Sequence, residues 1–220
     1  MLAWTSRNTT DAPPAVKDLI QRALVHPASK PLSWALYALP LVGVVLAGVA
    51  GRLGANPAEK LIHETGEWAL RWLWLALAVT PLREIFQMPQ VLRFRRGLGV
   101  AAFAYALLHF LAYAWLDKGW VLDDIVHDIV KRNFILVGAV ALVLMTPLAL
   151  TSFNAAVRAL GGARWRLLHK LVYAVAVAAL LHFLWKKSGK NDYAEVVVYA
   201  LGLAALLGWR FGRFSSQVGR

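Results

Sequence analysis

The sequence predicts an all-α, multi-pass membrane protein: a bundle of six transmembrane helices with both termini in the cytoplasm. Of the 220 residues, 59% are hydrophobic, whereas a soluble domain is about half apolar. The apolar residues gather in six blocks, each near the length that an α-helix needs to cross a bilayer core. Many of the ten Trp residues lie near the ends of these blocks, where membrane-interface anchors occur.

The six predicted helices cover residues 32–50, 68–82, 97–116, 134–152, 167–185 and 196–211. The second block is short and can extend to Phe86. The blocks divide the chain into a cytoplasmic N-terminal segment (1–31) with an interfacial helix, a transmembrane domain (32–211) and a cytoplasmic tail (212–220). The N-terminal segment has no apolar run and so no cleavable signal peptide. We therefore expect the first helix to act as the insertion signal.

The charge distribution predicts the orientation. Lys and Arg outnumber Asp and Glu by 24 to 12, a balance that in a soluble chain would suggest nucleic acid. Here the charges lie between the apolar blocks, so we expect membrane lipid and no nucleic acid as a partner. Lys and Arg dominate the two terminal segments and the segments 83–96 and 153–166, while the other loops carry nearly equal numbers of both signs. The positive-inside rule places the first set in the cytoplasm.

Histidines in the apolar blocks are the candidate functional residues. The chain has no Cys, which excludes disulfides, iron–sulfur clusters, thiolate ligation of haem and cysteine nucleophiles. His109, His169 and His182 lie within or at the edge of apolar blocks. A polar ring in hydrocarbon is costly, and such a residue indicates function by default. Histidine is also a common axial ligand of haem, so these residues predict a haem protein.

His109 and His182 are predicted at similar depths in the membrane. Each lies on a helix that starts at the cytoplasmic face, about 18 Å and about 22 Å from that start at 1.5 Å per residue. Both therefore lie in the outer half of the bilayer. An interhelical hydrogen bond is the ordinary explanation for one membrane histidine, but it explains a matched pair less well. We predict that the two bind one haem iron from opposite sides.

His169 and His63 are weaker candidates. His169 lies near the cytoplasmic face, which suits a second haem, but an ideal helix places it about 140° around the axis from His182. No histidine stands opposite it on the third helix, where the matching position is near Arg96. Three roles stay open for His169. It can share a haem with a non-histidine ligand, line a quinone or flavin site, or contact a haem propionate. His63, expected in the first outer loop, is either a quinone or partner site or a plain loop histidine.

Several stretches resemble the MsrQ (YedZ) family of haem-binding membrane subunits, within the wider ferric-reductase-like transmembrane group. The resemblance covers about residues 50–185 and is carried by Leu53-Gly54-Ala55-Asn56-Pro57, His63-Glu64-Thr65-Gly66, Thr80-Pro81-Leu82-Arg83, Arg93-Phe94-Arg95-Arg96-Gly97-Leu98-Gly99, Leu108-His109, Leu150-Thr151-Ser152, His169-Lys170-Leu171-Val172-Tyr173 and His182-Phe183-Leu184-Trp185. Two features of ferric reductases proper are missing: a second histidine on the third helix and a fused flavin–nicotinamide domain.

The resemblance implies a b-type cytochrome of the bacterial inner membrane, with haem histidines at His109, His169 and His182. It implies one haem b, with two as the alternative, and flavin mononucleotide as a further cofactor. The implied role is electron transfer, as a subunit distinct from the catalytic one. Electrons would pass from the quinone pool or a cytosolic flavin reductase to a periplasmic, MsrP-like molybdenum-cofactor reductase that repairs oxidised methionine.

Other functions stay open at this point. One is a cytochrome b subunit of another redox complex, which would have the same spectrum and a different partner. A second is a proton-coupled transporter with the histidines as relay, although none of the six blocks contains an interior Asp or Glu. A third is a structural membrane adaptor. For the electron-transfer role, we expect a partner to dock on the acidic outer loop that holds Asp117, Asp123, Asp124 and Asp128.

Overall fold

The computed structural model of the chain describes residues 16–189 and 191–218, and every regular element in them is a helix. The helices are α1 (Val16–Val25), α2 (Ser29–Val49), α3 (Pro57–Ile85), α4 (Leu92–Ala112), α5 (Leu122–Lys131), α6 (Asn133–Leu150), α7 (Asn154–Leu160), α8 (Gly162–Leu168), α9 (Leu171–Ser188) and α10 (Ala194–Val218). A 3₁₀ turn precedes α4, and a π-helical segment (Tyr113–Asp117) prolongs it. Parts of the predicted terminal segments, residues 1–15 and 219–220, lie outside the described residues.

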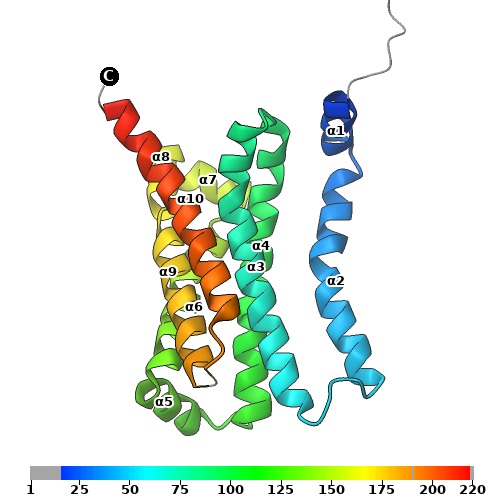
Figure 1. Ribbon diagram of the computed structural model, residues 1–220, viewed down its shortest axis with the longest axis vertical. Helices are drawn as coiled ribbons and strands as arrows, with labels where there is room; N and C mark the ends of the chain where they lie inside the picture. Colours follow the sequence, from blue (N-terminus) through cyan, green and yellow to red (C-terminus); the bar gives the residue numbers. More distant parts are fainter. Residues whose placement is uncertain (1–15, 190, 219–220) are drawn as a thin grey trace, which may run out of the picture.

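Two helix pairs form the centre of the bundle (Figure 1). α3 packs along α4, and α6 packs along α9; contacts within each pair are far more numerous than contacts between the pairs. α10 lies against α3 and α9, and α2 stands at the edge of the bundle with α1 beyond its end. α1, α7 and α8 lie at one end of the molecule and α5 at the other. The two ends correspond to the two sets of loops that the charges distinguish.

Four helical stretches within the described residues are long and apolar enough to cross a membrane: Ser29–Val49, Pro89–Asp117, Asn133–Leu150 and Gly162–Ser188. Their composition is that of a membrane protein. α3 and α10 are also long, with 29 and 25 residues, but neither is among these four stretches. Composition therefore identifies four of the six predicted spans.

α3 begins much earlier than the hydropathy predicted. The expected start was Trp68, whereas the helix starts at Pro57. The side chain of Asn56 caps it by accepting a hydrogen bond from the Glu59 main-chain N–H at 3.1 Å, and proline is favoured in the first turn because it has no N–H to leave unpaired. The prediction of a loop at residues 57–67 was wrong, and His63 lies on this helix.

The predicted fifth helix, 167–185, is interrupted near its start. α8 ends at Leu168 and α9 begins at Leu171, with His169 and Lys170 between them. The angular separation of His169 and His182 expected for one ideal helix therefore does not apply.

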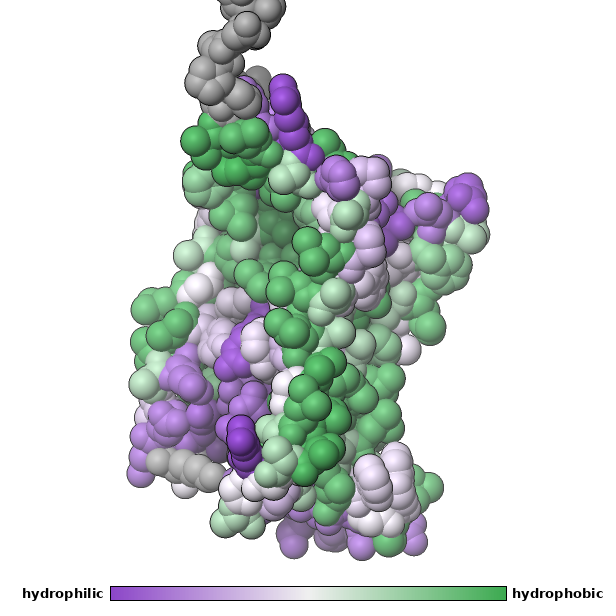
Figure 2. Space-filling model, turned by 90° about the vertical axis from the view of Figure 1, so that its right-hand side faces the viewer, coloured by the Kyte–Doolittle hydropathy of each residue, from purple (hydrophilic) through white to green (hydrophobic). Residues whose placement is uncertain are grey.

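α2 is attached to the bundle through tyrosines. Tyr37 is its buried residue, and the hydroxyl of Tyr105 on α4 donates to the Tyr37 carbonyl oxygen at 2.8 Å and accepts from the Leu41 N–H at 2.9 Å. Those two groups of α2 stand one helical turn apart. The rest of α2 is largely exposed and apolar, as expected for a lipid-facing helix. The face in Figure 2 shows large apolar areas, with polar residues gathered at its upper right and lower left.

Candidate functional site

The structure brings His109 and His182 together, as predicted. His109 lies on α4 and His182 on α9, so each central helix pair contributes one ring. The ring centroids are 6.0 Å apart and the ring planes stand at 76°. Two imidazole nitrogens that bind one metal ion at about 2.0–2.1 Å each place their ring centres roughly 6 Å apart. The spacing of the pair therefore fits one shared iron.

Main-chain carbonyls define the protonation of both rings. Nδ1–H of His109 donates to the Ile62 oxygen of α3 at 2.7 Å, and Nδ1–H of His182 donates to the Phe134 oxygen of α6 at 2.6 Å. A carbonyl oxygen can only accept, so the proton of each neutral ring lies on Nδ1 and the lone pair lies on Nε2. This is the arrangement that metal-ligating histidines adopt, because the hydrogen bond from the other ring nitrogen fixes the tautomer and raises ligand basicity.

A cavity of about 540 Å³ surrounds the two rings. Its walls come from α3, α4, α6 and α9 and are mainly apolar, with Leu70, Leu73, Phe110, Ile135, Met145 and Phe183 among the lining residues. Cofactor sites are typically apolar cavities of about 300–1,000 Å³ with a few placed polar groups. The volume, the apolar walls and the two imidazoles together fit a haem.

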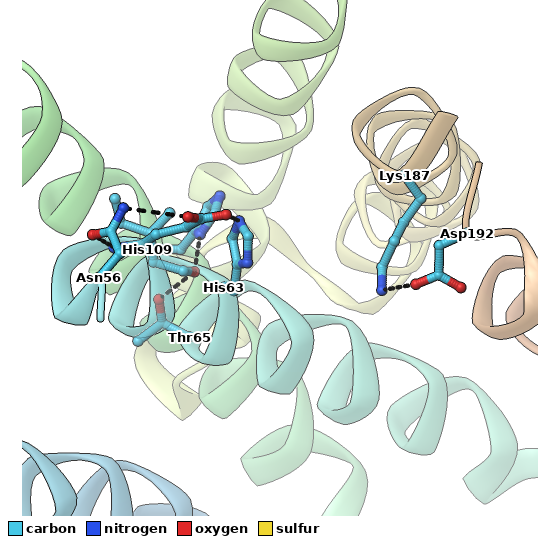
Figure 3. A network of polar contacts seen from close by, with 8 residues as sticks. Asn56, His63, Thr65, His109, Lys187 and Asp192 are labelled. Carbon is cyan, nitrogen blue, oxygen red and sulfur yellow. Dashed lines mark hydrogen bonds and ion pairs between the residues drawn. The ribbon is translucent and has the colours of Figure 1, made fainter. Parts of the chain in front are cut away.

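Polar residues line the cavity at the helix ends nearest α5. They include Glu59, His63, Glu67, Asp117, Arg132 and Lys186. His63 was expected in a loop, but it lies on α3 with its Nε2 3.7 Å from a Glu59 carboxylate oxygen (Figure 3). His63 therefore lines the same cavity as His109 and His182.

Asp128 is the centre of a buried ion-pair cluster beside this polar rim. Its carboxylate accepts from Arg132 Nε at 2.5 Å and from Tyr113 Oη at 2.7 Å, and lies 3.0 Å from Lys118 Nζ. Burial alone would raise the pKa of Asp128, but the hydrogen bonds from these three groups outweigh it and lower the pKa to about 2. Asp128 is therefore inaccessible to a partner that docks on this loop, whereas Asp117, Asp123 and Asp124 are exposed.

His169 lies apart from the pair, between α8 and α9, and does not line the cavity. Its ring stacks on Trp165 with centroids 3.8 Å apart, and its Nδ1–H donates to the Trp165 oxygen at 3.1 Å. Its Nε2 is buried and has no hydrogen-bond partner in the described part of the chain.

Sequence reasoning missed the residues that support the two rings. These are the carbonyls of Ile62 and Phe134 and two glycines that lie against the rings, Gly66 and Gly138. Gly66 stands inside a stretch that carried the family resemblance, but nothing in the sequence connects either glycine to a histidine on another helix. Only the packing of α3 on α4 and of α6 on α9 reveals the connection.

Comparison with known proteins assigns the class. Residues 65–180 match the sequence profile of the ferric reductase like transmembrane component, so the chain is a ferric-reductase-like transmembrane protein. It is 54% identical over 190 residues to the protein-methionine-sulfoxide reductase heme-binding subunit MsrQ of Polaromonas naphthalenivorans, covering 86% of this chain and 87% of that one. It is 49% identical over 177 residues to the subunit of the same name from Ralstonia nicotianae, covering 80% and 82%. The chain belongs to the MsrQ family, which confirms the resemblance. No solved structure matches it.

Proposed function

We propose that this chain is the haem-binding membrane subunit of a methionine sulfoxide reductase, with His109 and His182 as the axial ligands of one haem b. The observation that carries the proposal is the pair of imidazoles 6.0 Å apart, each with Nδ1–H bound to a main-chain carbonyl oxygen. The relatives are named as haem-binding subunits. The imidazole pair supports a specific place for the haem in this chain.

The residues of the cavity suit an electron carrier. A bound haem supplies reversible one-electron chemistry at its iron. His109 and His182 would occupy both axial positions, which leaves none for a substrate. The apolar walls would exclude water from a bound haem, and Lys186 and Arg132 lie at the rim beside the acidic Glu59, Glu67 and Asp117. We therefore assign electron transfer to this subunit and the chemistry on methionine sulfoxide to a separate catalytic subunit.

The topology that we propose has six spans in the bacterial inner membrane. α3 and α10 cross it together with the four apolar stretches, residues 32–211 form the transmembrane domain, and residues 1–31 and 212–220 are cytoplasmic. In this orientation the polar rim and α5 face the periplasm. Electrons would then leave towards a periplasmic, MsrP-like molybdenum-cofactor reductase, which we propose docks beside the exposed Asp123 and Asp124. The quinone pool or a cytosolic flavin reductase is the proposed donor, and His63 at the rim is a proposed quinone or partner contact.

A second cofactor near His169 is part of the proposal. The buried, unpartnered Nε2 supports metal ligation or hydrogen bonding to a cofactor on the cytoplasmic side. A second haem b, or flavin mononucleotide as the family resemblance implies, is proposed there.

The test is a reduced-minus-oxidised visible spectrum of the purified protein in detergent, with haem quantified per chain. We expect a low-spin b-type spectrum that is lost in His109→Ala and in His182→Ala. His127→Ala, an exposed histidine on α5, is the matched control and should keep the spectrum. A haem content near two that falls to one in His169→Ala would support the second site. A colourless protein from haem-replete cells would refute the proposed function.

A further inference from the structure

The two histidine rings sit on the same local structure, which occurs once on α3 and once on α6. His109 donates to the Ile62 carbonyl and lies against Gly66, four residues further along α3. His182 donates to the Phe134 carbonyl and lies against Gly138, four residues further along α6. The number of residues between Ile62 and Phe134 equals, to within one residue, the number between His109 and His182. We call each carbonyl with its glycine, Ile62 with Gly66 and Phe134 with Gly138, a histidine seat.

The spacing of four residues has a physical reason. In an α-helix the carbonyl oxygen of one residue accepts the N–H of the residue four positions on, and it keeps a second lone pair for another donor. Because each Cα–Cβ bond tilts towards the N-terminus of the helix, the side chain of the fourth residue stands beside that same carbonyl. A ring that approaches the carbonyl from outside the helix must therefore occupy the place of that side chain. Glycine is the residue that leaves the place free.

The distances show that both seats are filled by the rings. A Cβ atom on Gly66 would lie 2.9 Å from His109 Nδ1 and 3.0 Å from its Cε1. A Cβ atom on Gly138 would lie 2.7 Å from His182 Nδ1 and 2.9 Å from its Cε1. These separations are well below the contact distance of about 3.5 Å between non-bonded atoms. Gly43 and Gly208, by contrast, lie in helices with nothing within 4 Å of such a Cβ.

We infer that Gly66 and Gly138 are positioning residues for the two haem ligands. Each glycine gives its histidine access to a helix carbonyl, which holds the proton on Nδ1 and directs the Nε2 lone pair away from the helix that carries the seat. The inference rests on the proposed function, because it assigns the seats to ligation by His109 and His182. It adds a specific requirement: each ligand depends on a glycine of the partner helix in its pair.

A methyl group in a seat forces the ring away from the carbonyl. The ring then loses its hydrogen bond to the carbonyl, and the angle between the planes of the two histidine rings changes. Loss of such a bond in metalloproteins lowers metal affinity about 10- to 100-fold, and we expect a similar loss of haem affinity here. The weaker imidazole donor should raise the midpoint potential of the haem that stays bound, because a basic ligand favours the oxidised iron.

The experiment compares Gly66→Ala and Gly138→Ala with the control variants Gly43→Ala and Gly208→Ala. Haem per chain, midpoint potential and the low-spin electron paramagnetic resonance signal are measured for each purified protein. Alanine is the better helix former at all four positions, so a general effect on the helix would act alike in all. We expect lower haem content, a raised potential and an altered resonance signal in the two seat variants alone. Wild-type values for all three quantities in both seat variants would overturn the inference.

A second pair of proteins separates positioning from folding. In Gly66→Ala/His109→Ala and Gly138→Ala/His182→Ala the ring that the new methyl group would meet is absent. If the glycines act through the rings, each double variant should have the yield and size-exclusion profile of its His→Ala parent. A further loss in the double variants would overturn the inference, because the glycine would then be required by the helix packing itself. Haem that is lost in the His→Ala variants but unaffected in the seat variants would refute the seats and leave the proposed function intact.

Discussion

Asp128→Asn tests the ion-pair cluster beside the cavity that holds His109 and His182. The carboxylate is held by Arg132, Tyr113 and Lys118, and its pKa lies at about 2 instead of 3.8. Each unit of pKa shift corresponds to about 1.4 kcal/mol, so the shift corresponds to roughly 2 kcal/mol. Because the Arg132 side chain is 44% exposed, solvent screens part of this interaction. We expect Asp128→Asn to lower the free energy of unfolding at pH 7 by about 1–2 kcal/mol.

The stabilisation by Asp128 should depend on pH. A carboxyl whose pKa is lower in the folded than in the unfolded protein stabilises the fold above the unfolded pKa, and this contribution is lost as the pH falls through the folded pKa. The difference between wild type and Asp128→Asn should therefore shrink between about pH 4 and about pH 2. Chemical unfolding of the detergent-solubilised protein at several pH values measures it, with the exposed Asp123→Asn as control. A difference that stays constant down to pH 2 would refute the electrostatic explanation.

Three further changes probe the fold. Leu77→Ala, at a position that is 1% exposed, should destabilise the protein by about 2–5 kcal/mol, as measured by denaturant unfolding in detergent; a loss below 1 kcal/mol would mean that the bundle closes over the cavity. Asn56→Ala removes the cap of α3 and should cost about 0.5–2 kcal/mol, with faster hydrogen exchange in the first turn; unchanged exchange there would contradict a capping role. Tyr105→Phe removes the hydroxyl between α4 and α2 and should cost about 0.5–1.5 kcal/mol. Protease sensitivity confined to the α2 region would locate that loss, and unchanged sensitivity would count against the tyrosine attachment.

The sequence predicted that His109 and His182 lie at similar depth, but it misplaced the start of α3. The matched depth of the two histidines follows from the rise per residue of two helices that start on the same side of the membrane. In the structure the centroids of the two rings lie 6.0 Å apart. The start of α3 was missed because hydropathy does not record a cap. Asn56, Pro57 and Glu59 are a recognised start signal for a helix, and reading them would have placed His63 on α3.

Other features were out of reach of the sequence for a physical reason. The seats at Gly66 and Gly138 exist only because α3 packs on α4 and α6 packs on α9. The sequence around a helical glycine does not show which residue of another helix lies against it. The break between α8 and α9 at His169 and Lys170 contains no Pro or Gly, the residues that usually indicate the end of a helix. Asp128 reads as one of several acids in a polar loop, and only the tertiary contacts with Tyr113 and Lys118 show that it is buried.

The division of the centre into two helix pairs has a consequence for stability. α3 packs mainly on α4 and α6 mainly on α9, and each pair brings one ring of the histidine couple. A ligand that binds both rings would also connect the α3–α4 pair to the α6–α9 pair. Binding of the cofactor would therefore stabilise the packing of the two pairs against each other. In chains that receive no haem, the shared apolar core and α10, which packs on both α3 and α9, would be the remaining connection between the pairs. We therefore expect the unfolding of the purified protein to shift to higher denaturant concentration when haem is bound.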